Sequence, residues 1–204
     1  MSIYSVHPSI AYQQSIITNL KETTGRSIDD WKNLLSKKIW SNAKILAHHL
    51  KEDYNLGSTK ANLISELVLE IGLEDILEEK YLAIVPQYIE KMFATRPIIF
   101  PLYENIIDHI LQQKNETKIS PCATIVPLYR NHVYAQIKPS TKTRIDLGFA
   151  LKKYTKRTPV RLELTGGIEK GDRITHRIKL SSIDDFDSEA KEWLQIAYDL
   201  DFNN

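Results

Sequence analysis

The stretch HVYAQIKPSTKTRIDLGFAL, residues 132–151, decides the fold of this chain. Apolar and polar side chains alternate in it twice, first from Val133 to Lys138 and again from Arg144 to Leu151, with the connection PSTK between the two runs. A period of two is typical of strands with one buried face, and a short polar connection joins antiparallel neighbours. The stretch therefore predicts a β-hairpin whose apolar side chains face a core.

Further strands are predicted on both sides of this hairpin. KISPCATIV, residues 118–126, precedes it, and Pro121 marks it as an edge strand. PVRLELT, residues 159–165, and GDRITHRIKL, residues 171–180, follow it. The short connections favour an antiparallel meander of about five strands. Amphipathic helices expected over residues 102–111 and 181–200 flank the meander, so this half predicts an α+β domain.

The first 72 residues predict a small helical bundle. Ser27 and Asp30 form a variant of the capping box, and Gly25 suits the end of the preceding helix. The last two helices resemble a helix-turn-helix, but the second carries only Lys60 near its start, which favours a pair that closes a core over a reader of DNA grooves. The helices are expected over residues 8–22, 27–35, 41–54 and 58–71. The expected division is a helical domain at 1–72, a helical connector at 73–95 and the α+β domain at 96–204.

Charge is segregated along the chain. The net charge is only +1, yet residues 114–180 carry 15 Lys and Arg against 5 Asp and Glu. Residues 181–204 carry 1 Lys against 7 acids. Such segregation bears on what a protein binds more than on how it folds. The basic strands are therefore the place to expect a surface for polyanions.

Signatures of catalysis are absent from the sequence. It contains no GxxxxGK[ST], HExxH or GxSxG motif, and Gly166-Gly167 lies between strands, where a hairpin turn is favoured. Cys122 is the only cysteine, which excludes an internal disulfide and favours a reducing, cytoplasmic setting. No apolar run reaches the ~20 residues of a membrane-spanning helix. We therefore assign no catalytic residue, metal site, cofactor or membrane partner, and an enzyme is disfavoured.

The polar side of the strands supplies the candidate binding residues. A sheet face with Arg, Lys, Gln and Tyr can hold phosphates while an aromatic ring stacks on a base. Two alternatives stay open, namely ion pairs across a solvated face and an acidic C-terminal helix packed over that face. The candidates for nucleic-acid or anion binding are Tyr134, Gln136, Lys138, Lys142, Arg144, Arg161, Arg177 and Lys179, with Lys152, Lys153, Lys156 and Arg157 in the loop beside them.

Two histidines stand close to these candidates in sequence. In GDRITHRIKL the period of two places Ile174, His176, Ile178 and Leu180 on the apolar side. His176 is therefore expected to be buried, neutral and hydrogen-bonded to a neighbour. In the alternative, His176 or His132 acts in a pocket between the sheet and the helices.

Longer stretches resemble two known families. TGRSIDDWKNLL and AKILAHHLKEDYNLGSTKANLI, within residues 22–70, resemble the small helical family of domain of unknown function 4287. RPIIFPLYENI, RNHVYAQIKPSTKTRIDLG, RITHRIKL and EWLQIAY, within residues 96–199, are similar to domain of unknown function 5655. The resemblance implies a bacterial protein in which the two domains occur together, and the second has been found beside nuclease-like modules. The order helix, meander, helix also resembles the double-wing, YjbR-like fold, some of whose members are described as DNA-binding.

Three functional hypotheses follow from these observations. The first is a non-enzymatic binding protein whose basic sheet face engages nucleic acid or another polyanion, with the helical domain as an accessory. The second is a small-ligand-binding domain or an enzyme with a pocket that uses His132 or His176. The third is a protein–protein adaptor. An open basic face, a pocket with a histidine beside a carboxylate, and an exposed apolar patch distinguish the three.

Overall fold

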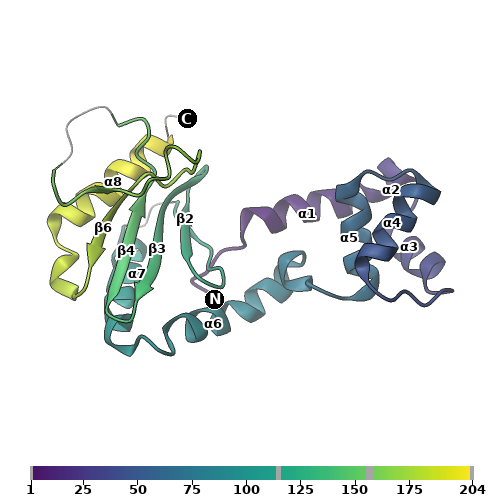
Figure 1. Ribbon diagram of the computed structural model, residues 1–204, viewed down its shortest axis with the longest axis horizontal. Coiled ribbons are helices and arrows are strands. Elements are labelled where there is room, and N and C mark those ends of the chain that lie inside the picture. The colour runs from purple at the N-terminus through teal and green to yellow at the C-terminus, as the bar shows by residue number, and fades with distance from the viewer. Residues whose placement is uncertain (1, 114–115, 155–158, 203–204) are drawn as a thin grey trace. The chain divides into compact units, whose positions relative to one another are not determined.

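The protein consists of two compact units. The computed structural model describes residues 2–113, 116–154 and 159–202. One unit is residues 6–84, and the other joins residues 1–5 to residues 85–204 (Figure 1). Each unit has its own hydrophobic core. The domain boundaries predicted at residues 72 and 96 describe which parts of the chain fold independently. They stay a prediction.

The first unit is helical, as the sequence predicts. Its first predicted helix is two helices, because the chain breaks at Asn19. Gly25 has a φ of +77° and ends the second of them, and Ser27 and Asp30 form the predicted capping box. The helices are α1 (Pro8–Thr18), α2 (Leu20–Thr24), α3 (Ile28–Leu35), α4 (Ala43–Tyr54) and α5 (Ser58–Leu69), followed by a short 3-10 turn at Leu73–Asp75.

Helix α5 lies inside this unit rather than on its surface. Its Ala61 and Ile64 belong to the main core, while its Leu63 and Leu67 pack with Ile76 in a second cluster. A helix that reads a DNA groove needs one long solvated face. Because α5 is buried on two sides, the structure agrees with a helix pair that closes a core.

Helices α6 (Glu78–Phe93) and α7 (Phe100–Gln112) lead into the second unit, with a 3-10 turn at Pro97–Ile99 between them. Helix α6 occupies most of the predicted helical connector. Its Ile89, Met92 and Phe93 are buried in the core of the second unit. None of the described helices is both long enough and apolar enough to span a membrane.

The second unit is built on one antiparallel sheet, which confirms the α+β prediction. The sheet has six strands where about five were expected, and its order is β1-β2-β3-β4-β6-β5. The hairpin predicted from residues 132–151 is β3–β4, in which Ile137 lies opposite Leu147. The strands are β1 (Lys118–Ile119), β2 (Val126–Tyr129), β3 (Val133–Thr141), β4 (Arg144–Phe149), β5 (Glu163–Leu164) and β6 (His176–Leu180).

One side of the sheet, the covered face, carries the core. Helices α7 and α8 (Ser188–Phe202) pack against it (Figure 1). Ala190, Leu194 and Ala197 of α8 are buried together with the strands. The acidic C-terminal helix therefore packs on the apolar side, and the alternative in which it covers the basic side is wrong. The strand residues of the covered face are Val126, Leu128, Ala135, Ile137, Ile145, Leu147, Phe149, Ile178 and Leu180.

Three predicted strands are shorter than expected. In KISPCATIV only Lys118 and Ile119 form β1, and Val126 already begins β2. In PVRLELT only Glu163 and Leu164 form a strand, and the side chain of Val160 is fully exposed while Leu162 is buried. In GDRITHRIKL pairing begins at His176. Ile174 therefore does not join the covered face as predicted, and instead lies against Gly148 on the opposite side of the sheet, where its Cγ2 leaves no room for a Cβ.

Candidate functional site

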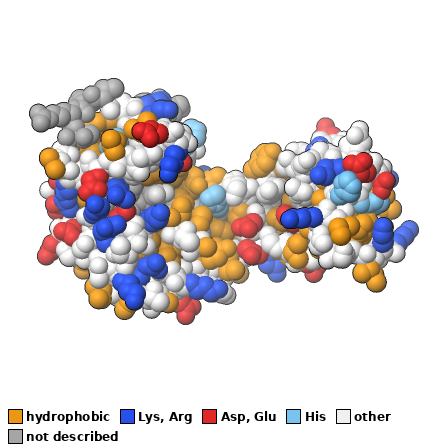
Figure 2. All heavy atoms as spheres, in the orientation of Figure 1, with side chains coloured by type: hydrophobic (Ala, Val, Ile, Leu, Met, Phe, Trp, Pro, Cys, Tyr) orange, Lys and Arg blue, Asp and Glu red, His pale blue; other side chains and the backbone are white. Residues whose placement is uncertain are grey.

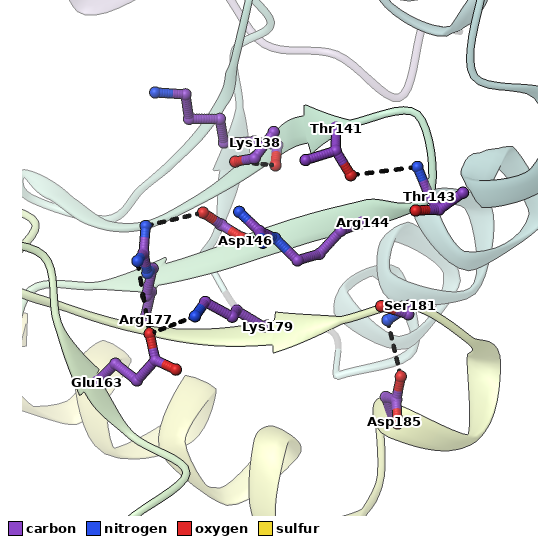
Figure 3. Close-up of polar contacts among 11 residues, drawn as sticks. Lys138, Thr141, Thr143, Arg144, Asp146, Glu163, Arg177, Lys179, Ser181 and Asp185 are labelled. Atoms are coloured by element: carbon purple, nitrogen blue, oxygen red, sulfur yellow. Dashed lines mark hydrogen bonds and ion pairs between the residues drawn. The ribbon is translucent and has the colours of Figure 1, made fainter.

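The side of the sheet opposite the helices, the open face, carries most of the predicted binding residues. Residues paired directly across neighbouring strands point to the same side. Asp146 is paired with Lys138 on one side and Lys179 on the other, and Gly148 is paired with Gln136 and Arg177. Figure 3 shows the charged members of these rows beside one another. The open face consists of Gln136, Lys138, Arg144, Asp146, Gly148, Glu163, Arg177 and Lys179, with Lys142 in the β3–β4 turn.

Asp146 organises the centre of the open face. Its carboxylate is buried beneath two arginines, accepting a bond from Arg144 Nε at 2.8 Å and one from Arg177 Nη1 at 3.0 Å. Both arginine side chains stay about one third exposed. A buried carboxylate in this position fixes the two arginines without removing them from solvent.

Glu163 of β5 pairs with Lys179 and shares Arg177 with Asp146. Its carboxylate lies 2.9 Å from Lys179 Nζ and 3.4 Å from Arg177 Nη2. The hydrogen bond from Lys179 is the main cause that lowers the pKa of Glu163. The predicted alternative of cross-strand ion pairs is thus present on this face, but it is incomplete, because Lys138 and Lys142 are exposed and form no ion pair with any described residue.

Tyr134 is not on the open face, so its prediction as a stacking residue is wrong. The β2–β3 pairing passes from Leu128 opposite Ala135 to Tyr129 opposite Val133, which leaves Tyr134 as the extra residue of a bulge. The bulge turns its ring into the core, edge-on to Tyr198 at 5.4 Å, with its hydroxyl 2.9 Å from that of Thr117. Burial raises the pKa of Tyr134. The pairing with Val133 places a different tyrosine, the half-buried Tyr129, on the open side of the sheet.

Arg161 is also displaced from its predicted position. Because residues 159–162 do not form a strand, its side chain lies at the start of α8 instead. Its guanidinium contacts Asp187 at 2.6 Å and Glu189 at 3.5 Å, and it donates to the backbone oxygen of Asp185. These acids neutralise Arg161, and it is not part of the open face. Lys156 and Arg157 lie outside the described residues.

A groove crosses the open face over Gly148. It encloses about 450 Å³ and is walled by the strands on one side and by the turn that precedes β6 on the other. Its volume lies in the range of ~300–1,000 Å³ typical of ligand sites. In Figure 2, Lys and Arg gather over the sheet with acids among them. The cations of this sheet groove are Lys138, Lys170, Arg173 and Arg177, and its acids are Asp146 and Asp172.

His176 has the environment predicted for it. Its side chain is buried on the side of the covered face, and its Nδ1 lies 2.9 Å from Thr175 Oγ1. Burial lowers its pKa, which keeps the ring neutral near pH 7.

His132 belongs to a cluster of hydrogen bonds around Asp201 that was not predicted from the sequence. The buried Asp201 of α8 accepts bonds from the backbone N–H groups of Asn131 and His132, both at 2.9 Å, and from Arg173 Nη2 at 2.6 Å. His132 Nδ1 lies 3.2 Å from the same carboxylate. Burial alone would raise the pKa of Asp201, but these hydrogen bonds outweigh it and lower the pKa. The sequence carried one indication of this cluster. Asp201 continues the helical spacing of the buried residues Leu194, Ala197 and Tyr198.

A pocket does exist between the helices and the sheet, but around a different histidine. It encloses about 380 Å³ between α7 and α8 and is lined by His109, Tyr134 and Lys191, and by neither His132 nor His176. Burial and then the charge of Lys191 lower the pKa of His109. Within the part of the chain that the structure describes, no three His, Cys, Asp or Glu side chains are grouped to hold a metal ion.

Comparison with known proteins reproduces the division into two domains. The family model described as domain of unknown function (DUF4287) matches residues 13–69, and the model described as domain of unknown function (DUF5655) matches residues 89–201. No curated protein and no solved structure matches the chain. The second match covers more than half of the sequence and includes the whole sheet with its open face. The chain therefore belongs to the DUF5655 family and carries a DUF4287 domain ahead of that domain.

Proposed function

We propose that the DUF5655 domain is a non-enzymatic binding module that holds the phosphates of a nucleic acid on its open face. The observation that supports this most directly is that α8 packs on the other side of the sheet, so the cations of the open face are exposed. Four strand cations and Lys142 stand against only two acids, Asp146 and Glu163. Excess positive charge on an accessible surface is what phosphate backbones recognise.

The cations divide into two kinds with different roles. Arg144 and Arg177 are oriented by Asp146, and a planar guanidinium that is already held loses less entropy when it binds a phosphate. Lys138 and Lys142 have no internal ion pair to break, so their full charge is available to the ligand. The two arginines therefore offer contacts at fixed positions, and the two lysines offer contacts whose positions can adjust to the ligand.

Binding through this face should not depend on base sequence. The ring of Tyr134, which was predicted to stack on bases, is buried, and Arg144 and Arg177, a residue type that can read base edges, are held by Asp146. Contacts to phosphates position a nucleic acid without distinguishing one sequence from another. A cytoplasmic location, expected from the sequence, accords with such a ligand and stays a prediction.

A direct test is the anisotropy of labelled oligonucleotides titrated with the full chain at ~50 mM salt. The Lys138→Ala/Lys142→Ala variant should bind more weakly, and its dependence of log K on log salt should be shallower by about 1.8 for a duplex, since each lost contact contributes about 0.9. Arg144 and Arg177 are left intact because truncating them would leave Asp146 buried without its partners.

The matched control is Lys37→Ala/Lys44→Ala, which removes the same charge from exposed positions of the helical unit. Thermal unfolding should show all three proteins folded. The proposal fails if the wild type does not bind at ~50 mM salt, or if the open-face and control variants lose affinity equally.

A further inference from the structure

A second groove begins where the sheet groove ends. It encloses about 230 Å³, and Lys152 and Lys153, which follow β4, line it together with Leu200 of α8. Asp172 and Arg173 line both grooves, so the two meet at these residues. We call the second one the end groove. Its cations extend the basic surface beyond the open face.

The two grooves lie at different places, one on the open face of the sheet and the other past the end of β4. The sheet groove has Gln136 and Gly148 in its lining and belongs to the open face. The end groove is lined by Leu200, a residue of the helix that packs on the covered face. A ligand that occupies both must therefore turn around the end of the sheet at Arg173.

Arg173 is held in place at this turning point. Its Nε donates to the backbone oxygen of Val133 at 2.8 Å, and its Nη2 contacts Asp201 at 2.6 Å. The side chain is still 39% exposed. A charged group that is fixed on two sides and open on a third is suited to a phosphate at a bend.

We propose that the preferred ligand is a single-stranded nucleic acid whose backbone passes from the sheet groove, around Arg173, into the end groove. This inference rests on the proposed function. A duplex has a persistence length of about 50 nm and does not follow a bend around the edge of one small domain. A single strand has no such stiffness and can place successive phosphates on Lys138, Arg173 and Lys152.

Recognition would depend on flexibility rather than on bases. Among the described residues that line the two grooves none is aromatic, so stacking on these linings contributes nothing to the choice between single and double strands. A duplex would contact the open face alone, and a single strand would contact both grooves. The two ligands should therefore respond differently to substitutions in the end groove.

The test compares Lys152→Glu with Lys138→Glu in the full chain, using a single strand and a duplex of about 20 nucleotides and base pairs. Both lysines are exposed, and neither forms an ion pair with a described residue. Lys152→Glu should weaken the single strand about tenfold and leave the duplex unchanged, whereas Lys138→Glu should weaken both. Lys44→Glu in the helical unit is the control for net charge.

Each outcome separates this inference from the proposed function. If Lys152→Glu affects single strand and duplex alike, or affects neither, the inference is overturned while binding to the open face still stands. If neither oligonucleotide binds, both proposals fail, and binding of inorganic polyphosphate in that case would assign the surface to another polyanion. Thermal unfolding establishes that each variant is folded.

Discussion

The two faces of the same sheet differ in the side chains that they carry. The covered face is apolar and packs against α7 and α8, while the open face presents Lys138, Arg144 and Arg177 to solvent. Both faces are carried by the same strands, β3, β4 and β6. The difference shows that alternation along one strand can place core side chains on one side and exposed cations, the proposed binding residues, on the other. Substitutions on the two sides should therefore be separable in experiment.

The largest expected effect is loss of stability from the covered face. Leu147→Ala removes a fully buried side chain from β4 and should lower the free energy of unfolding by about 2–5 kcal/mol. Lys138→Ala, opposite its neighbour Asp146, should change it by less than about 0.5 kcal/mol. Urea unfolding followed by circular dichroism measures both. Equal losses of unfolding free energy in the two variants would contradict the distinction between the faces.

A smaller effect on the covered face should depend on pH. Burial lowers the pKa of His176 below its ordinary value of 6.5, so near and below that pH the unfolded chain binds more protons than the folded chain. Stability should therefore be fully present above pH 6.5 and decline as the pH falls through the window down to the lowered value. His176→Gln should remove part of this decline.

The measurement is urea unfolding at a series of pH values. His7 and His109 also have lowered pKa values, so the variant should retain part of the slope. A wild-type stability that does not change between pH 7 and pH 5 would contradict the burial of a neutral histidine.

The smallest effect concerns Glu163, one of the two acids of the open face. Glu163→Gln releases Lys179 and one contact of Arg177, and it should tighten binding of an oligonucleotide about two- to threefold at low salt. Stability should not change measurably, because Glu163 is on the edge strand β5 and its ion pairs are partly exposed. Anisotropy titration measures this change in affinity. The Lys138→Ala/Lys142→Ala variant, titrated in parallel, gives the change caused by removing two cations for comparison. Weaker binding would show that Glu163 positions the cations rather than competes for them.

Much of the fold could be predicted from local sequence. The β3–β4 hairpin follows from a strict period of two, and the Ser27–Asp30 cap follows from two residues three positions apart. Such features depend on neighbours in the chain, so the residues themselves report them. The burial of His176 was predictable for the same reason.

The errors arose where the chain departs from regular geometry or where partners are distant in sequence. Tyr134 follows the alternation in sequence, yet one extra residue in the β2–β3 pairing turns it into the core. Arg161 binds acids more than twenty residues away, and Asp201 gathers donors from two separate segments. A bulge or a distant ion pair leaves no period that a single sequence can show. The candidate site was therefore predicted as a set of charges, and its grooves were not.

Gly148 limits which residues the members of this family can carry at this part of the sheet. It is the one position on the open side of β4 without a side chain, and Ile174 packs into the space, 2.6 Å from where a Cβ would stand. The depth of the sheet groove is thus set by a pair of positions far apart in sequence. Among relatives the two should change together, with a larger residue at position 148 accompanied by a smaller one at position 174. The depth of the sheet groove, and with it the preferred ligand, would then differ between relatives that carry different residues at these two positions.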